Sequence, residues 1–153
     1  MKVYSMLPHN SYNLLYLQTL KSSSLKTKCC FTTYDMVLPF PIKKVLIYYL
    51  EQHHKSYLQQ VKLAKRLLTI NKLVPLYISE KVVLFPVKHQ RAPLQVYINA
   101  FTVIGLSSHK DGTLIAFENN LSFYVTEPYT LVYKKWQECL LLMHLVQKTT
   151  SFY

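Results

Sequence analysis

The sequence predicts a single α+β domain in which mostly antiparallel strands form a sheet and helices pack on it. Three observations favour this fold class: short segments rich in β-branched and aromatic residues, a basic amphipathic segment near the middle, and an apolar helical stripe near the C-terminal end. A chain of 153 residues is long enough for one hydrophobic core and too short for a second domain of ordinary size. We therefore expect one domain over residues 1–148 and a short tail over 149–153.

Turn-forming residues divide the first forty positions. Pro8, the serines at 22–24 and the prolines on either side of Phe40 leave short extended pieces, such as 12–20 and 30–38. The next segment, 42–54, fits two structures. Its β-branched and aromatic residues suit a strand, and its spacing equally suits a helix that continues through the two histidines at its end.

A basic amphipathic helix is predicted over residues 55–68. Its apolar stripe recurs at helical spacing and consists of Tyr57, Val61, Ala64 and Leu68. A polar stripe is displaced by two residues, which is roughly 200° around a helix, and consists of Lys55, Gln59, Lys62 and Arg66. Lys65 widens the basic face, and the leucines at 58, 63 and 67 are expected to widen the apolar one.

The C-terminal half is expected to contain most of the sheet. Strands are predicted at 73–79, 81–87 and 94–106, followed by a hairpin whose strands are 112–118 and 121–125. Asn119-Asn120 suits the turn of this hairpin because asparagine tolerates positive φ angles. Thr126 and Pro128 begin the last helix, whose apolar stripe should pack on the sheet and consists of Val132, Trp136, Cys139, Met143 and Val146.

Composition predicts an acidic partner. The chain has 18 Lys and Arg against 7 Asp and Glu, so its net charge is +11, and nucleic acid or an anionic membrane surface would satisfy that charge. The first residues lack the continuous apolar stretch of a secretory signal, and polar residues interrupt the segment 131–146, so we expect neither a signal nor a membrane span there. Three cysteines, two of them adjacent, make a poor disulfide framework, which favours a reducing cytoplasm.

The sequence lacks the motifs that usually mark catalytic, nucleotide-binding and metal sites. The only glycines are Gly105 and Gly112, so neither a phosphate-binding loop nor a dinucleotide-binding turn can form. The seven acidic residues are scattered singly, without a close pair for general acid and base roles. The His53-His54 and Cys29-Cys30 pairs lack the usual spacing of zinc ligands, and Cys139 falls on an apolar stripe. We predict no enzyme activity, no cofactor and no metal.

Basic residues concentrate in the middle of the chain. Between Lys43 and Arg91 lie ten of the 18 basic residues and only two of the seven acidic ones. Such a surface can neutralise several phosphates, and its affinity should fall steeply with salt. Arg66 and Arg91 are the only arginines. Because a guanidinium can bond two acceptors or enter a narrow A·T-rich minor groove, they are the better candidates for specific contact.

Residues 75–142 contain several segments in a distinctive order. The apolar strand Val82-Val83-Leu84-Phe85-Pro86 ends in Phe-Pro, and the loop Gln90-Arg91-Ala92-Pro93 leads into Tyr97-Ile98. With the hairpin at 111–125 and the following helix, this order resembles the ComK family of bacterial competence transcription factors, whose apolar strand ends in F-P and whose arginine-containing loop leads into W-I. A weaker resemblance covers 4–69, with Met6-Leu7-Pro8 near its start and Ser56-Tyr57 before the basic segment.

The resemblance implies a transcription factor, an activator of competence genes for DNA uptake, in the cytoplasm at the nucleoid. It would bind double-stranded A·T-rich promoter DNA through the minor groove and its shape, as a homodimer or higher assembly, with no membrane partner. Two arginines, Arg66 and Arg91, would enter or line the groove. Five lysines would hold phosphates: Lys55, Lys62, Lys65, Lys72 and Lys88.

The chain also departs from the family pattern. The segment from Ser56 to Lys62 lacks the glycines that are usual there, and Tyr97 stands where tryptophan is usual. The sequence ends soon after the last predicted helix, without the C-terminal extension through which family members are turned over. The chain is therefore identified as a short, divergent relative.

Two other binding classes fit the charge. An RNA-binding or ribosome-associated protein would prefer structured or single-stranded RNA to duplex DNA. A peripheral membrane protein would turn the apolar stripe of the 55–68 helix toward lipid and not toward a core. Competition between RNA and DNA, and flotation with anionic vesicles, would separate these classes from a DNA-binding protein.

Overall fold

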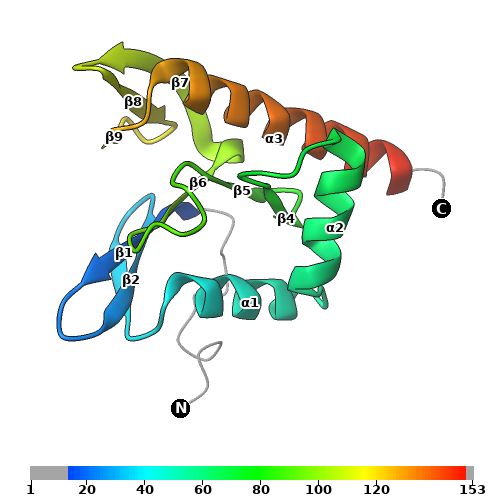
Figure 1. Ribbon diagram of the computed structural model, residues 1–153, viewed down its shortest axis with the longest axis horizontal. Coiled ribbons are helices and arrows are strands. Elements are labelled where there is room, and N and C mark those ends of the chain that lie inside the picture. Colours follow the sequence, from blue (N-terminus) through cyan, green and yellow to red (C-terminus); the bar gives the residue numbers. More distant parts are fainter. Residues whose placement is uncertain (1–13, 151–153) are drawn as a thin grey trace.

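A six-stranded antiparallel sheet forms the middle of the computed structural model, which describes residues 14–150 (Figure 1). Its strands follow the spatial order β3-β2-β1-β6-β5-β4. Their bounds are β1 Leu14–Lys21, β2 Leu25–Phe31, β3 Asp35–Leu38, β4 Leu76–Ser79, β5 Val82–Pro86 and β6 Val96–Asn99. The N-terminal three strands and the later three meet where β1 pairs with β6, with Leu17 opposite Tyr97. Segments far apart in sequence therefore share one sheet.

Helix α1 (Ile42–Gln52) covers one face of this sheet. Pro41 precedes its first residue, and its buried side chains recur at the spacing of one helical face. They are Ile42, Val45, Leu46, Tyr49 and Leu50. They pack against sheet residues such as Leu17, Phe31 and Leu84. The structure thus decides the two alternatives for 42–54 in favour of the helix.

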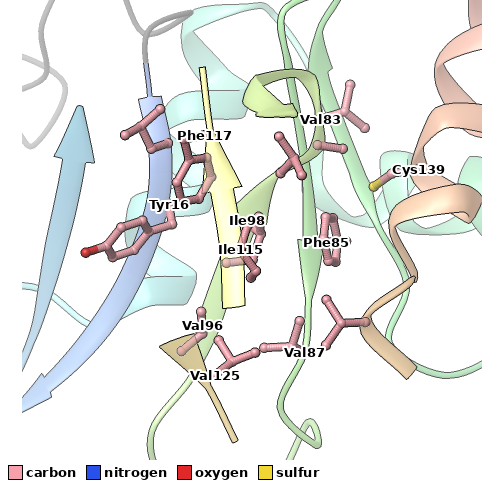
Figure 2. Close-up of a cluster of buried hydrophobic side chains, with 14 of the residues drawn as sticks. Tyr16, Val83, Phe85, Val87, Val96, Ile98, Ile115, Phe117, Val125 and Cys139 are labelled. Atoms are coloured by element: carbon pink, nitrogen blue, oxygen red, sulfur yellow. The ribbon is translucent and has the colours of Figure 1, made fainter. Parts of the chain in front are cut away.

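A second layer covers the opposite face. It contains a three-stranded antiparallel sheet, formed by β7 (Val103–His109), β8 (Gly112–Phe117) and β9 (Ser122–Val125), and the long helix α3 (Tyr129–Thr150). Figure 2 shows the buried side chains between the layers: Tyr16 and Ile98 from the large sheet, Ile115 and Phe117 from β8, and Cys139 from α3. The Tyr16 ring lies 4.0 Å, centroid to centroid, from the Phe123 ring of β9.

Helix α2 (Tyr57–Leu68) packs beside β4, at the end of the large sheet, and also contacts α1 and α3 (Figure 1). Its two apolar sides serve the two cores. Tyr57 and Val61 pack with the α1 layer, whereas Leu63, Ala64 and Leu67 pack with the α3 layer. The face that remains is exposed to solvent.

The predicted fold class is confirmed: the chain is α+β, with antiparallel sheets and a C-terminal helix packed on the sheet. The hairpin turn is also confirmed, because Asn120 has a φ of 67° between β8 and β9. In the stripe predicted for the last helix, Val132, Cys139 and Val146 are buried. That helix continues to Thr150, two residues past the expected domain boundary.

Several expected boundaries were wrong. The piece 30–38 is not one strand, because a turn at 32–34 separates β2 from β3. The long strand 94–106 is divided into β6 and β7 by the 3-10 turn η3 (Ala100–Thr102), which the side chain of Asn99 caps. Helix α2 begins at Tyr57, after an N-cap at Ser56, so Lys55 lies outside it.

Leu58 does not widen the apolar face of α2. It is 60% exposed, because it lies one turn before Lys62 and therefore on the same side of the helix. The resemblance at Met6-Leu7-Pro8, the break at Pro8, the start of the 12–20 strand and the end of the tail at 151–153 fall outside the described residues.

Candidate nucleic-acid interface

The solvent face of α2 carries the first group of cations. Lys62, Lys65 and Arg66 are all exposed there, and none of them has a carboxylate partner in the described part of the chain. Both ends of the helix are fixed. The Ser56 hydroxyl accepts a hydrogen bond from the Gln59 N–H at 3.4 Å, and Thr69 ends the helix in the left-handed region with a φ of 55°. The positive charges of Lys65 and Arg66 in the last turn interact favourably with the negative end of the helix dipole.

Helix α1 adds two further exposed cations, Lys43 and Lys44. The Lys43 ammonium lies 5.2 Å from the centre of the Tyr57 ring of α2, and the Lys44 ammonium lies 4.7 Å from the Phe40 ring. Both contacts are of cation–π type, which holds the stems while the charge still faces water. Neither lysine was among the site residues expected from the sequence, although both lie within the basic region.

The loop between β5 and β6 presents Arg91. The side-chain nitrogen of Gln95 lies 2.8 Å from the carbonyl oxygen of His89, 3.3 Å from that of Gln90 and 2.9 Å from that of Ala92. A turn closes where the Ala92 N–H donates to the His89 carbonyl. The loop is therefore held from inside by one amide, and the Arg91 side chain stands exposed on it.

These three elements enclose a groove of about 340 Å³. Its polar lining comes from α1, α2, the 71–74 segment and the β5–β6 loop: Lys43, Lys65, Asn71, Lys88, Gln90 and Gln95. Its apolar lining includes Ile42, Leu46, Val61, Leu73, Val74 and Pro86, together with the rings of Tyr57 and Tyr97. No acidic side chain lines the groove. Of the predicted site residues, the groove brings Lys65 and Lys88 together, and Arg91 follows Gln90 of its lining.

Lys55 and Lys88 use their ammonium groups within the protein. Lys55 donates to the carbonyl oxygen of Ile78 at 2.7 Å and lies over the Tyr77 ring, and burial lowers its pKa. Lys88 forms an ion pair with Glu127 at 2.8 Å and donates to the Thr126 hydroxyl. These two lysines join the α1–α2 turn to β4 and the β5–β6 loop to the start of α3.

Lys72 is held through its backbone. Its carbonyl oxygen accepts a hydrogen bond at 3.0 Å from the ammonium of Lys135, a buried lysine of α3 that also pairs with Glu138 at 2.7 Å. The Lys72 side chain itself remains exposed. Helix α3 thereby fixes the segment that follows α2, and with it the position of this cation.

Sequence reasoning missed the uncharged members of the groove. Asn71, Gln90 and Gln95 look like ordinary loop residues, and only the fold brings them to one place. Tyr97 lies in a strand, where tyrosines usually pack in cores. Burial, and secondarily the nearby Tyr57 hydroxyl, raises the pKa of Tyr97. Tyr97 lines the groove, and a tyrosine hydroxyl can donate or accept a hydrogen bond there.

The remaining residues of chemical interest are the cysteines and the His53-His54 pair. No three His, Cys, Asp or Glu residues gather within residues 14–150 in a way that could hold a metal ion. The three cysteines are free and buried. His53 and His54 are exposed at the α1–α2 turn. None of the described helices is both long and apolar enough to cross a membrane.

Comparison of the chain with protein-family models, curated proteins and solved structures finds no match.

Proposed function

We propose that the protein is a DNA-binding transcriptional regulator of the ComK type, which activates competence genes by binding A·T-rich promoter DNA. The observation that carries the proposal is the surface formed by α2, α1 and the β5–β6 loop. Its exposed cations have no carboxylate partners within residues 14–150, and the groove between these elements has no acidic lining. A surface with this charge attracts the phosphates of a duplex.

The exposed cations and the internally bonded ones take different roles in this proposal. Lys62, Lys65 and Lys72 contact phosphates as mobile charges, and Lys43 adds a fourth contact from α1. Arg66 and Arg91 enter or line the minor groove. Lys55 and Lys88, whose ammonium groups already have partners, hold the surrounding elements in place and touch DNA weakly or not at all.

The phosphate contacts are tested by salt dependence. In fluorescence anisotropy with an A·T-rich promoter duplex, Lys62→Gln should lower affinity equally for all sequences. It should also reduce the slope of log K against log salt by about one, because one phosphate contact is lost. Lys134→Gln is the matched control, since it removes an exposed helical lysine from α3, on the opposite face of the sheet. Equal effects of the two variants would contradict the proposal.

The groove contact is tested by sequence preference. Arg91→Ala should weaken binding to the A·T-rich duplex about tenfold or more and reduce its preference over a G·C-rich duplex. A gel-shift titration with both duplexes measures the two effects. Unchanged affinity and preference would contradict the role of Arg91. Stronger binding to single-stranded or structured RNA than to either duplex would replace DNA with RNA as the partner.

A further inference from the structure

The groove between α1, α2 and the β5–β6 loop has the size and lining of a small-molecule site. Its volume of about 340 Å³ lies at the lower end of ligand pockets, which hold molecules of roughly nucleotide size. Its apolar part includes Leu46, Val61 and Pro86, and its polar groups come from separate elements. Leu46 and Val61 also pack α1 and α2 together in the core, and together with Pro86 they give the groove an apolar wall.

The charge of the groove selects an anion. Lys43 reaches it from α1 and Lys65 from α2, and no acidic residue is part of the lining. Lys88 is the third lysine of the lining, but Glu127 balances its charge at 2.8 Å. These two exposed ammonium groups of Lys43 and Lys65, which pair with no carboxylate within residues 14–150, attract a small anion such as a phosphate group.

The uncharged groups favour a planar body attached to that anion. Tyr57 and Tyr97 bring aromatic rings to the groove, and aromatic faces stack on flat heterocycles. Within residues 14–150, no hydrogen bond engages the Tyr97 hydroxyl or the side-chain amides of Asn71 and Gln90. Three free polar groups around an apolar wall can bond the edge of a heterocycle.

We propose that this groove binds a free nucleoside phosphate, with its phosphate between Lys43 and Lys65 and its base against Tyr97 and the apolar wall. The proposal does not depend on DNA binding. If both hold, Lys43 and Lys65 are common to the two sites, so the nucleotide and DNA compete, and the nucleotide acts as an effector that releases the regulator from its promoter.

Titration calorimetry on the full chain tests the site without DNA. Adenosine monophosphate, guanosine monophosphate and inorganic phosphate serve as probes. At least one nucleotide should bind one to one and about tenfold more tightly than phosphate, because the base adds stacking. Lys43→Gln and Lys65→Gln should each weaken nucleotide binding about tenfold. Asn71→Trp places a large side chain at an exposed position of the groove lining and should block nucleotide binding. Lys134→Gln should bind as the unaltered chain does, and thermal melts confirm that each variant is folded.

Three outcomes would overturn the proposal. One is that neither nucleotide binds, and a second is that inorganic phosphate binds as tightly as both nucleotides. The third is that Asn71→Trp leaves nucleotide binding unchanged. A parallel titration with duplex DNA distinguishes a site for free nucleotides from a site for the nucleotides of DNA. If a duplex binds and Lys43→Gln weakens it while free nucleotides do not bind, the groove belongs to the DNA surface alone and the effector site is wrong.

Discussion

The side-chain amide of Asn99 makes four hydrogen bonds to backbone groups of neighbouring elements. Its side chain is fully buried, with an oxygen that accepts from the N–H groups of Val83 and Phe101 at 3.1 and 3.3 Å. Its nitrogen donates to the carbonyl oxygens of Leu14 at 2.7 Å and Lys81 at 3.1 Å. One amide therefore joins β1, the β4–β5 turn, β5 and η3, and it ends β6 where a continuous strand was predicted.

No pattern in the sequence could reveal this role. Asn99 lies between apolar residues, so its segment looks like a strand, and the Leu14 partner is distant in sequence. A strand is predicted from residues that are adjacent in sequence. The hydrogen-bond partners of a buried amide come from backbone segments that only the fold brings close to it. The wrong boundary at 94–106 has this cause.

Replacing Asn99 should therefore be costly. Asn99→Ala removes the side-chain partner of four backbone groups, of which the Val83 N–H and the Leu14 C=O are buried. We expect the free energy of unfolding to fall by about 3 kcal/mol. Urea denaturation followed by circular dichroism measures it. Asn71→Ala is the control, because this exposed asparagine has no side-chain hydrogen bond within residues 14–150, and its effect should stay within about 0.5 kcal/mol. Equal stability of the two variants would refute the role given to Asn99.

The helices show what periodicity can and cannot decide at the scale of an element. The α2 stripe was predictable because apolar and basic residues alternate around one turn, and the structure buries Ala64 and exposes Lys62. Segment 42–54 stayed ambiguous because β-branched and aromatic residues suit both structures. What decided it was the partner, since α1 lies flat on a sheet face that accepts Val45 and Tyr49.

The β5–β6 loop was predictable as a break between strands, but its shape was not. The shape depends on Gln95, which lies beyond the turn and is tied to β1, because its N–H donates to the Thr19 hydroxyl at 3.1 Å. The side chain of Gln95 then holds the carbonyl groups around Arg91. We regard this as preorganisation of the arginine, since an ordered loop loses less entropy on binding.

Gln95→Ala should thus affect binding more than folding. The loop loses its internal donor, so the backbone amides of 89–92 should exchange hydrogen faster and DNA affinity should fall about threefold to tenfold. The free energy of unfolding should change by less than about 1 kcal/mol, because the amide is near the surface. Hydrogen exchange by mass spectrometry and anisotropy titration give the two readouts. Faster exchange with unchanged DNA affinity would show that the loop does not take part in binding.

At the scale of the whole molecule, the sheet has a core on each face. Strand β5 is buried at every residue, so its sequence shows no alternation and gives no hint of which side chain faces which helix. The same limit applies to the groove, whose walls come from four separate segments. The clustering of basic residues in the sequence pointed to the part of the chain that carries the exposed cations. Only the packed structure shows that Lys88 pairs with Glu127 and that Lys55 bonds the Ile78 carbonyl.

The two cores also contain the cysteines. Their burial makes the free energy of unfolding change with pH in the alkaline range. Burial, reinforced by the neighbouring Cys30, raises the pKa of Cys29 to about 12. Burial, with a hydrogen bond to Asp35, raises the pKa of Cys30 to about 11. Burial also raises the pKa of Cys139 of α3 well above its usual range. In the unfolded chain these thiols titrate near their ordinary value of about 8.5.

The sign of the effect follows from proton binding. Above about pH 8.5 the unfolded chain releases thiol protons that the folded chain retains, so the unfolded state gains stability and the free energy of unfolding falls. Stability should be nearly constant from about pH 7 to 8 and should decrease steadily from about pH 9 to 10.5. Urea denaturation under reducing conditions at each pH measures the slope. Cys29→Val removes one titrating group from the α1 core, and its slope should be shallower than that of Lys134→Gln. A free energy of unfolding that stays level or rises up to about pH 10.5 would show that the buried thiols are not linked to folding.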